Sequence, residues 1–448
     1  MPKNIIKGEY RPRNPRKTSL WQIMNKWWDR FTEVYENVYQ KKYGYLRREV
    51  QKSGDQYLRC GLPDFGFARV RCDDCKYEYL LSFSCRRRNC PSCMKKRQLQ
   101  FSEFLTNDVL ENVSHRHLVV SLPKILRPYF NFNRKLLTQL SKFAYQSTIE
   151  VMRTELGQKK WVGASVNVIH TYGSLISWTP HAHCMFAWGL FDKNGGYHGL
   201  PNLPEDVILE VFRKKLFKYL LDEYIVSQDL VDNLLSWEHS GFHVYIGPLI
   251  SSMDKDSLEC LGQYQNRGPI SLERLKTVPG GDDKKGQLYI EHVDSNSYGS
   301  NEKIVLVGDK FIKKFKGNKR EFTPLDFIAE YMMHVPKLNQ KLVFYNGFYS
   351  NKSRGTRRKK AMTGVKIVNE AKDEPSSIKN SSWARYIKKT FEVDPLKCPH
   401  CNGNMRIISM IEDPTVIYKI LKHLNLLYDS ESEDHERPPP DDTGWEQI

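Results

Sequence analysis

Six of the ten cysteines of this 448-residue chain lie close together in its first quarter. They are Cys60, Cys72, Cys75, Cys85, Cys90 and Cys93. Cys72 and Cys75 form one CxxC pair, and Cys90 and Cys93 form a second. Structural zinc requires four soft ligands in a tetrahedron, and a CxxC turn presents two thiolates to one ion. We therefore predict one structural Zn²⁺ ion that is held by the two pairs in a zinc ribbon.

The other cysteines of interest allow more than one interpretation. Cys60 and Cys85 either belong to a second ion or replace a member of one pair. Cys398 and Cys401 form a CxxC pair near the C-terminus that supplies only two good ligands, so this pair either binds a second zinc ion or carries no metal. The residues that could complete a site there are His400 and His423.

The excess of positive charge indicates what kind of molecule the protein binds. The formal net charge is +17 and the pI is about 9.2, which favours nucleic acid over the alternative of a merely basic protein. Basic side chains on a rigid zinc scaffold suit phosphate contacts, although a solvated charged loop would have the same composition. The residues predicted to contact DNA are Arg86, Arg87, Arg88, Lys95, Lys96 and Arg97 in the zinc module, and Arg354, Arg357 and Arg358 in a later basic run.

The sequence shows neither a membrane-spanning segment nor a secretory signal, and this bears on the cellular compartment of the protein. No segment approaches the roughly 18 continuous apolar residues that would cross a bilayer, and the first residues have no apolar run of a secretory signal. We expect a cytoplasmic protein associated with the nucleoid. Thiols stay reduced in that compartment, so the cysteines are expected to be metal ligands rather than disulfides.

Hydrophobic periodicity predicts a mixed fold, α/β of the α+β kind, with an antiparallel-rich sheet and flanking helices. The expected helices include residues 18–41, 136–152 and 205–226, and the expected strands include residues 67–70, 77–83, 117–122, 166–172 and 181–190. The predicted units are a basic lead and helix (1–55), a zinc-binding module (56–100), a catalytic domain (101–345), a basic arm and linker (346–380), a small C-terminal CxxC unit (381–428) and an acidic disordered tail (429–448).

His181 and His183 are the second centre of interest. Residues two apart on a strand point to the same face, so both imidazoles can reach one metal ion. Two histidines at this spacing also occur by chance, and the motif alone is weak evidence. In a basic chain directed to DNA, however, the pattern is similar to that of HUH endonucleases.

Several segments, in this order, resemble the insertion-sequence 91 family of rolling-circle transposases. They are Arg69–Cys75 and Ser84–Cys93 for its zinc module, His117–Pro123 and Trp178–His183 for its catalytic strands, Cys260–Leu275 for its tyrosine segment, and Tyr345–Gly355 and Val393–Cys401 for its distal parts. The resemblance implies an HUH-endonuclease core in which the histidines hold Mg²⁺ or Mn²⁺ against the scissile phosphate. It also implies that a helical tyrosine attacks the phosphorus and forms a 5′-phosphotyrosine.

The same resemblance assigns Tyr264 as the nucleophile, with Arg267 and Arg274 of its segment as DNA contacts. Family members with two catalytic tyrosines place them four residues apart, and here the partner position is Cys260. The chain is therefore similar to the single-tyrosine variants of common-region elements. A tyrosine packed in the core is the alternative for Tyr264, and Tyr331 is a second, lower-ranked candidate. His170 is the best-placed third metal ligand, unless it is an ordinary core or surface histidine.

These observations predict a transposase that cuts and rejoins single-stranded DNA at the ends of a mobile element, with target DNA and a homodimer as further partners. A plasmid or phage replication initiator would use the same chemistry, but the zinc module and the distal segments argue against it. A decayed transposase that only binds DNA would form no covalent adduct. A zinc hydrolase would leave the basic charge and the tyrosine segment unexplained.

Overall fold

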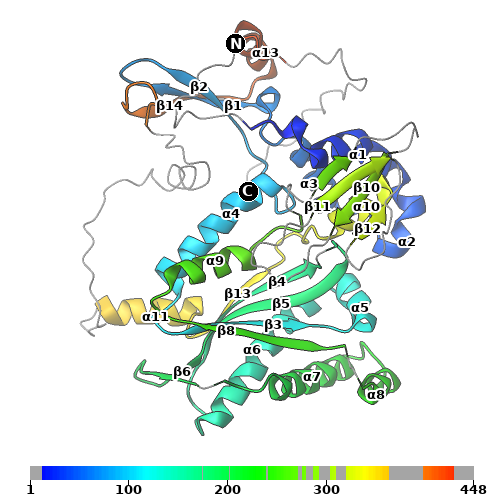
Figure 1. Cartoon of the computed structure of the whole chain (residues 1–448), viewed down its shortest axis with the longest axis vertical. Helices are drawn as coiled ribbons and strands as arrows, with labels where there is room; N and C mark the ends of the chain where they lie inside the picture. The colour runs from blue at the N-terminus through cyan, green and yellow to red at the C-terminus, as the bar shows by residue number, and fades with distance from the viewer. Residues whose placement is uncertain are drawn as a thin grey trace.

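The computed structural model of the chain describes residues 13–173, 175–200, 202–238, 241–270, 275–278, 286–291, 303–308, 319–362 and 397–427. Helices and largely antiparallel sheets make up this part of the chain, which confirms the predicted α/β class (Figure 1). No helix in the described part is long and apolar enough to cross a membrane. Arg274, the first twelve residues of the basic lead, most of the linker and the acidic tail lie outside the described residues.

A five-stranded antiparallel sheet with the strand order β13-β4-β5-β3-β8 positions the candidate site. Its strands are β3 (His115–Ser121), β4 (Ala164–Tyr172), β5 (Trp178–Ala187), β8 (His243–Ile250) and β13 (Val343–Gly347). In the register of this sheet, His170 lies opposite His181, and Val119 lies opposite His183. Side chains alternate between the two faces of a strand, so each strand sends one set of residues to each face.

One face of the sheet is covered by an apolar core. Helices α6 (Leu136–Glu155) and α7 (Glu205–Asp222) lie on this face, with the shorter α5 (Arg127–Phe132) and α8 (Gln228–Ser236) at its edge (Figure 1). The residues of β3, β4 and β5 buried against these helices are Leu118, Val120, Ile169, Ala182, Cys184 and Phe186. Because these are alternate positions, the intervening histidines of β3, β4 and β5 must face the other side.

The opposite face carries two helices that contact each other, α4 (Pro91–Phe104) and α9 (Lys255–Gln265). A short π-helical segment, Leu105–Val109, continues α4. Leu258 of α9 packs with Phe101 and Leu105 against Val168 and Met185 of the sheet. Figure 1 shows both helices above the strands, so the histidine-bearing face is the one that α9 covers.

The N-terminal helices form a separate core with a later helix. The helix expected over residues 18–41 is present as α1 (Ser19–Val38), which ends three residues early; Thr18 caps it, and its hydroxyl accepts a hydrogen bond from the Trp21 amide at 3.3 Å. Trp28 and Phe31 of α1 pack with Phe327 of α10 (Pro324–Met333). The neighbouring elements are α2 (Gln40–Tyr43), α3 (Arg48–Arg59), and a sheet of β9 (Leu275–Val278), β10 (Gly286–Glu291), β11 (Lys303–Gly308) and β12 (Lys319–Phe322).

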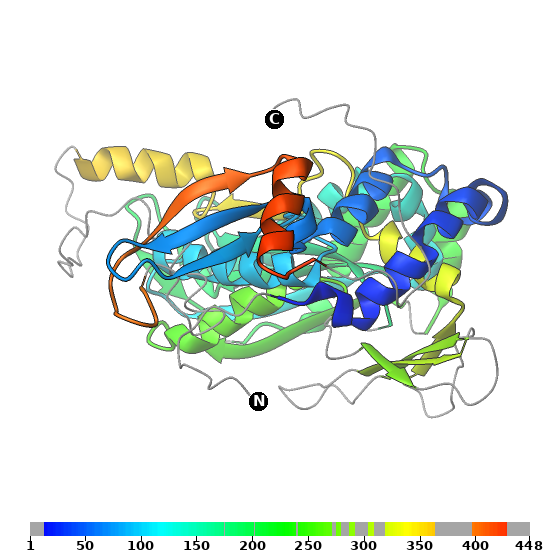
Figure 2. The ribbon, with the colours of Figure 1, turned by 90° about the horizontal axis from the view of Figure 1, so that it is seen from above.

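The predicted zinc-module hairpin is present as β1 (Phe67–Cys72) and β2 (Glu78–Ser82), but its sheet has a third strand from the far end of the chain. β14 (Met405–Ile411) pairs antiparallel with β1, which becomes the central strand. Helix α13 (Pro414–His423) follows β14 and packs on Phe67 through Ile417 and Leu421. Figure 2 shows the C-terminal strand and helix lying against the N-terminal hairpin.

Two smaller features complete the described part. Gly195, with φ of +85°, lies in the turn between β6 (Gly189–Phe191) and β7 (Tyr197–Gly199). The basic run expected to form an arm is instead a helix, α11 (Asn351–Met362). Arg357 of this helix forms a 2.9 Å ion pair with Glu111, and its guanidinium lies 3.6 Å from the ring centroid of Phe348. These contacts give the helix an attachment to the core that periodicity alone does not reveal.

Candidate active site and metal centres

Three histidines from two neighbouring strands meet on the sheet face that α9 covers. His181 and His183 project from β5, and His170 projects from β4 opposite His181. One ring nitrogen of each lies within 4.8 Å of the others, and Nε2 of His181 is 3.0 Å from Nε2 of His183. The structure thus brings His170, the proposed third ligand, together with the HxH pair.

One ring nitrogen of His181 and one of His170 make hydrogen bonds that orient these imidazoles. Nδ1 of His181 donates to the Thr179 carbonyl at 2.7 Å, and Nε2 of His170 donates to the Gln265 carbonyl at 2.6 Å. Nδ1 of His170 is buried without a hydrogen-bond partner. Such hydrogen bonds fix the tautomer of a metal-binding histidine and leave the other nitrogen free to act as a ligand.

A fourth histidine, His117 of β3, adjoins the cluster and was not among the predicted site residues. Its Nε2 lies 2.9 Å from Nδ1 of His183, and the two rings stack. If Nδ1 of His183 donates in this bond, the free lone pairs of His170, His181 and His183 converge. The sequence did contain a signal for His117: the apolar residues Leu118 and Val120 face the opposite core, which directs His117 to the polar face.

Burial keeps the clustered histidines uncharged. Desolvation lowers the pKa of His117 and of His181 to about 4, and neighbouring positive charge adds to this effect. The pKa values of His170 and His183 are lowered well below the usual value for the same reason. At neutral pH the four imidazoles are therefore neutral, which is the form that binds metal.

Tyr264 lies beside this cluster. It is the penultimate residue of α9, and its ring contacts those of His183 and His117 edge-on, at centroid distances of 5.3 and 6.0 Å. The side chain is 43% exposed, so a phosphate from solvent can reach it. The guanidinium of Arg267 lies 4.5 Å from the centroid of the same ring. The alternative of a fully buried core tyrosine does not describe this position.

Hydrogen bonds and a glycine fix the C-terminal end of α9 above the histidines. The His170 bond described above ends on the carbonyl of Gln265, the residue after Tyr264, and the Tyr172 hydroxyl donates to the Arg267 carbonyl. Gly262 lets α9 approach α4 closely, since a Cβ there would lie 3.1 Å from the Cα of Ser102. The tyrosine-bearing helix is thus attached both to a histidine of the cluster and to α4.

Tyr331, the second candidate nucleophile, is in a different environment. It is only 1% exposed, and its hydroxyl donates to the Asn89 carbonyl inside the core of the N-terminal helices. Burial raises its pKa well above the usual value. A phosphate could reach this hydroxyl only if the core opened, so the position does not suit a nucleophile.

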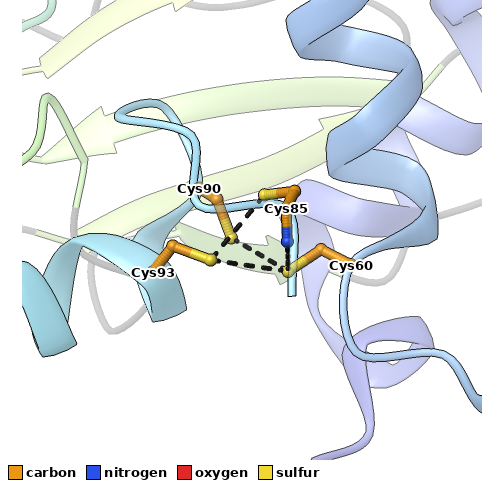
Figure 3. A group of neighbouring side chains, drawn as sticks. All are labelled: Cys60, Cys85, Cys90 and Cys93. Atoms are coloured by element: carbon orange, nitrogen blue, oxygen red, sulfur yellow. Dashed lines mark hydrogen bonds between the residues drawn. The ribbon is translucent and has the colours of Figure 1, made fainter. Parts of the chain in front are cut away.

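The first cysteine cluster consists of Cys60, Cys85, Cys90 and Cys93, and Figure 3 shows the four sulfurs pointing toward one another. Sγ of Cys60 lies 3.6 Å from Sγ of Cys90 and of Cys93, and Sγ of Cys85 lies 3.7 Å from that of Cys93. A tetrahedral zinc site with Zn–S bonds of about 2.3 Å has S–S edges of about 3.8 Å. The amide of Cys85 also donates to the Cys60 sulfur at 3.3 Å, a bond that stabilises a thiolate. The four residues therefore fit a single zinc ion.

This cluster corrects the predicted pairing of the two CxxC motifs. Cys90 and Cys93 share their cluster with Cys60 and Cys85, not with Cys72 and Cys75. Cys60 is the C-cap of α3, and Cys90 is the N-cap of α4. The chain path between these helices therefore brings Cys60 and Cys85 to the Cys90–Cys93 pair. Spacing in the sequence favours one zinc ion shared by the two CxxC pairs, because spacing alone contains no information on the fold between them.

The second cysteine cluster joins Cys72 and Cys75 to Cys398 and Cys401, which are far away in the sequence. The two nearest sulfur pairs are Cys72 with Cys401 at 3.5 Å and Cys75 with Cys398 at 3.4 Å. Neither His400 nor His423 belongs to the cluster. The ring of His400 instead contacts the ring of Tyr77 in a tilted arrangement, at a centroid distance of 4.3 Å. The C-terminal CxxC pair is thus completed by cysteines rather than by a histidine.

The basic residues predicted to contact DNA are only partly free of other contacts. Lys95 and Arg86 are exposed, whereas Arg87 donates to Gln56 and Arg97 donates to the Arg86 carbonyl. In α11, Arg358 is exposed but lies 3.6 Å from a carboxylate oxygen of Asp108, and the Arg357 ion pair with Glu111 gives that residue a structural role. The remaining predicted contacts within the described part of the chain are Arg88, Lys96, Arg267 and Arg354, all partly buried. DNA contact by these side chains remains a prediction.

Arg88 lies in sequence between Cys85 and Cys90, two members of the first cysteine cluster. Together with His170, Tyr172 and Arg267 it lines a small cavity of about 40 Å³. Burial and the nearby Arg97 lower the pKa of Arg88 to about 10, at which the guanidinium is still charged at neutral pH. Two guanidinium groups, from different parts of the chain, therefore lie next to the histidines.

Comparison with known proteins adds independent findings. Residues 30–122 match a family model described as a transposase zinc-binding domain, and residues 164–357 match one described as a putative transposase. The chain is 23% identical over 393 residues to the transposase for insertion sequence element IS801 of Pseudomonas savastanoi pv. phaseolicola, covering 83% of this chain and 87% of that protein. It is 25% identical over 308 residues to the putative transposase y4qJ of Sinorhizobium fredii, covering 63% and 70%. No solved structure matches the chain.

The matched segments coincide with the structural centres. The zinc-binding model spans all of the first cysteine cluster, and the second model spans His170, the HxH pair and Tyr264. The chain therefore belongs to the insertion-sequence 91 family of transposases, proteins that act on the DNA of a mobile element.

Proposed function

We propose that this transposase cuts one strand of DNA with Tyr264 and keeps the cut end as a 5′-phosphotyrosine until it is rejoined. The observation that carries the proposal is the position of Tyr264, an exposed tyrosine whose ring lies against His183 in a cluster of three histidines. The arrangement combines a nucleophile and a cation site on one face of the sheet, as in-line phosphoryl transfer requires.

The histidine cluster fits a divalent cation such as Mn²⁺ or Mg²⁺. Three neutral imidazoles can each offer one lone pair, and the buried Nδ1 of His170 has no other partner in the structure. A bound cation would withdraw charge from the phosphate oxygens and help to position the scissile group. An all-nitrogen donor set suits Mn²⁺ better than the oxygen-preferring Mg²⁺.

The chain's own residues account for the bond changes of the reaction. The Tyr264 oxygen attacks the phosphorus of one phosphodiester and loses its proton, while the bond from phosphorus to the 3′ oxygen breaks. The leaving strand takes up a proton and ends in a free 3′-hydroxyl. Attack by a 3′-hydroxyl on the tyrosyl phosphate reverses these steps and rejoins DNA without an external energy source. Arg267, next to the phenol ring, supplies positive charge where negative charge develops.

Within the described residues, Tyr264 is the only exposed tyrosine whose ring contacts the histidine cluster, because Tyr172, which stacks on His170, is buried and its hydroxyl donates to the Arg267 carbonyl. Cys260, four residues before Tyr264, is exposed on the same helix and offers no second phenol. Two strand cuts by one protomer therefore require Tyr264 to act twice in sequence. The other possibility is that a second protomer supplies its own Tyr264, in which case the active form is a homodimer.

The reaction class is tested by searching for the covalent product. The protein is incubated with labelled single-stranded DNA from the ends of its element, with Mn²⁺ or Mg²⁺ and in parallel with EDTA. We expect a labelled species that survives denaturing electrophoresis and is lost with EDTA, and peptide mass mapping should place the phosphate on Tyr264. If binding is intact but no adduct forms, the chain is a DNA-binding protein without this activity. A single cut at a replication origin, without joining of two ends, would indicate an initiator.

His117 offers a test of the cation site that leaves every proposed ligand in place. We expect His117→Ala to raise the Mn²⁺ concentration required for cleavage by about 10- to 100-fold, because His183 loses the partner that orients it. The measurement is a metal titration of cleavage at saturating DNA. His117→Gln, which keeps an acceptor, should restore much of the affinity. Equal loss in both variants, without a change in metal requirement, would show that His117 serves only packing.

A further inference from the structure

The second cysteine cluster combines two CxxC turns from opposite ends of the chain. Cys72 and Cys75 end and follow β1, whereas Cys398 and Cys401 precede β14. The four sulfurs lie within 4.8 Å of one another, and Cys75 and Cys398 are 323 residues apart in sequence. Cys398 and Cys401 lie outside both matched family models, which end at residues 122 and 357.

The backbone of each turn has the form expected of a metal-binding knuckle. The residue after each second cysteine is left-handed: Lys76 follows Cys75 with φ of +64°, and Asn402 follows Cys401 with φ of +60°. The Cys398 amide donates to the Gly403 carbonyl at 2.9 Å, closing the C-terminal turn. Two similar turns that face one another with their sulfurs inward are difficult to explain by chain packing alone.

The two turns also fit closely against each other. A Cβ added at Gly403 would lie 2.0 Å from a carboxylate oxygen of Asp74, so a larger residue there would require the Asp74 side chain to move. The Asp73 amide donates to the Asn404 carbonyl at 3.1 Å, and Asp73 forms a 2.6 Å ion pair with Arg406. These contacts continue directly into the pairing of β1 with β14. The four cysteines thus lie at one end of the interface between β1 and β14, which other hydrogen bonds and an ion pair also hold together.

The sulfur distances select a mononuclear metal over disulfides. The closest pairs, at 3.4 and 3.5 Å, are far longer than a disulfide bond of about 2.05 Å. They are near the edge of about 3.8 Å that a tetrahedral ZnS₄ site requires. Cys72 and Cys398 are buried among Val70 and Met405, which would shield two of the thiolates from water.

We propose that Cys72, Cys75, Cys398 and Cys401 bind a second structural zinc ion that fastens the C-terminal segment to the N-terminal zinc module. Each turn contributes two ligands, so neither end of the chain can complete the site alone. The ion holds β14 against β1 and thereby places α13 on the module. The N-terminal module is then a composite of both ends of the chain, with one zinc ion inside it and one at the junction.

The first test is metal content, measured by mass spectrometry on the full-length protein purified under reducing conditions. We expect two zinc ions per chain in the wild type and one in the Cys398→Ser/Cys401→Ser variant. The matched control is Cys260→Ser, an exposed cysteine outside both clusters, which should keep two. One zinc ion in all three proteins would overturn the proposal, as would iron in place of zinc. Loss of four reactive thiols in unreduced, metal-free protein, with Cys260 still reactive, would indicate disulfides in this cluster and would overturn the proposal.

The second test measures whether the zinc ion holds the C-terminal segment on the N-terminal module. A specific protease site is inserted between residues 372 and 380 of the full-length chain, and the cut protein is passed over a sizing column. We expect the C-terminal piece to remain bound in the zinc-loaded protein and to separate after chelation or in the Cys398→Ser/Cys401→Ser variant. Separation from zinc-loaded wild type would overturn the proposed role. Retention in all conditions would show that strand pairing holds the segment without the metal, and would overturn it equally.

Discussion

Replacing Tyr264 by phenylalanine should abolish the covalent adduct and lower single-strand cleavage by at least about 10³-fold, as expected for loss of a nucleophile. The substitution removes one oxygen and leaves the ring that packs edge-on against His183 and His117. DNA affinity should therefore change little. The measurement is a single-turnover cleavage assay on labelled end sequences, accompanied by a binding titration on the same DNA.

Tyr331→Phe is the matched control for this prediction, because it removes the same oxygen from the other candidate. Its hydroxyl donates to the Asn89 carbonyl in the core, so its loss should cost about 1 kcal/mol of stability and leave cleavage intact. The assignment would be overturned if Tyr331→Phe lost the adduct, or if Tyr264→Phe retained it. Cys260→Ser should cleave like the wild type, since the residue at the partner position offers no phenol.

Replacing Cys90 by serine should release one zinc ion and destabilise the whole catalytic half of the protein. Structural zinc sites contribute on the order of 10–16 kcal/mol of metal-binding free energy, and loss of one buried ligand should cost about 5 kcal/mol of it. Cys90 is 2% exposed and caps α4, which packs through Ser102 against Gly262 of the tyrosine helix. We therefore expect a lower melting temperature together with weaker cleavage, although Cys90 is remote from the reacting atoms.

The measurement is thermal unfolding and zinc content in parallel, with Cys260→Ser as the exposed control. Addition of excess zinc should recover part of the melting temperature, because three ligands remain. A Cys90→Ser variant with the full zinc content and an unchanged melting temperature would show that the cluster holds no structural metal. Loss of zinc without loss of cleavage would instead mean that packing against α4 positions α9, the helix that carries Tyr264, without help from the metal.

The parts of the site that depend on local pattern could be predicted from the sequence. The alternation of β5 directs His181 and His183 to one face. The start of the helix expected from residue 18 is equally local, because the Thr18 side chain caps α1. In each case, the physical cause acts between residues fewer than about five positions apart, so one sequence contains it.

The parts that depend on chain path could not be predicted. The ligand partners of Cys72 and Cys75 are 323 or more residues away, and no spacing rule reaches over that distance. The role of His117 depends on which strands are neighbours, because β3 adjoins β5 only through the order of the sheet. The attachment of α11 through Arg357 and Glu111 is likewise a tertiary contact, and composition could show only that the segment is basic.

The position of β14 beside β1 has a consequence for the synthesis of the protein. A ribosome adds roughly 5–20 residues per second, so the 323 residues between Cys75 and Cys398 take roughly 15 to 60 seconds to make. During this interval β1 has an unpaired edge, which is open to pairing with another chain. The module that emerges first is therefore among the last to be finished, and a nascent chain that stalls before residue 398 would carry this edge exposed.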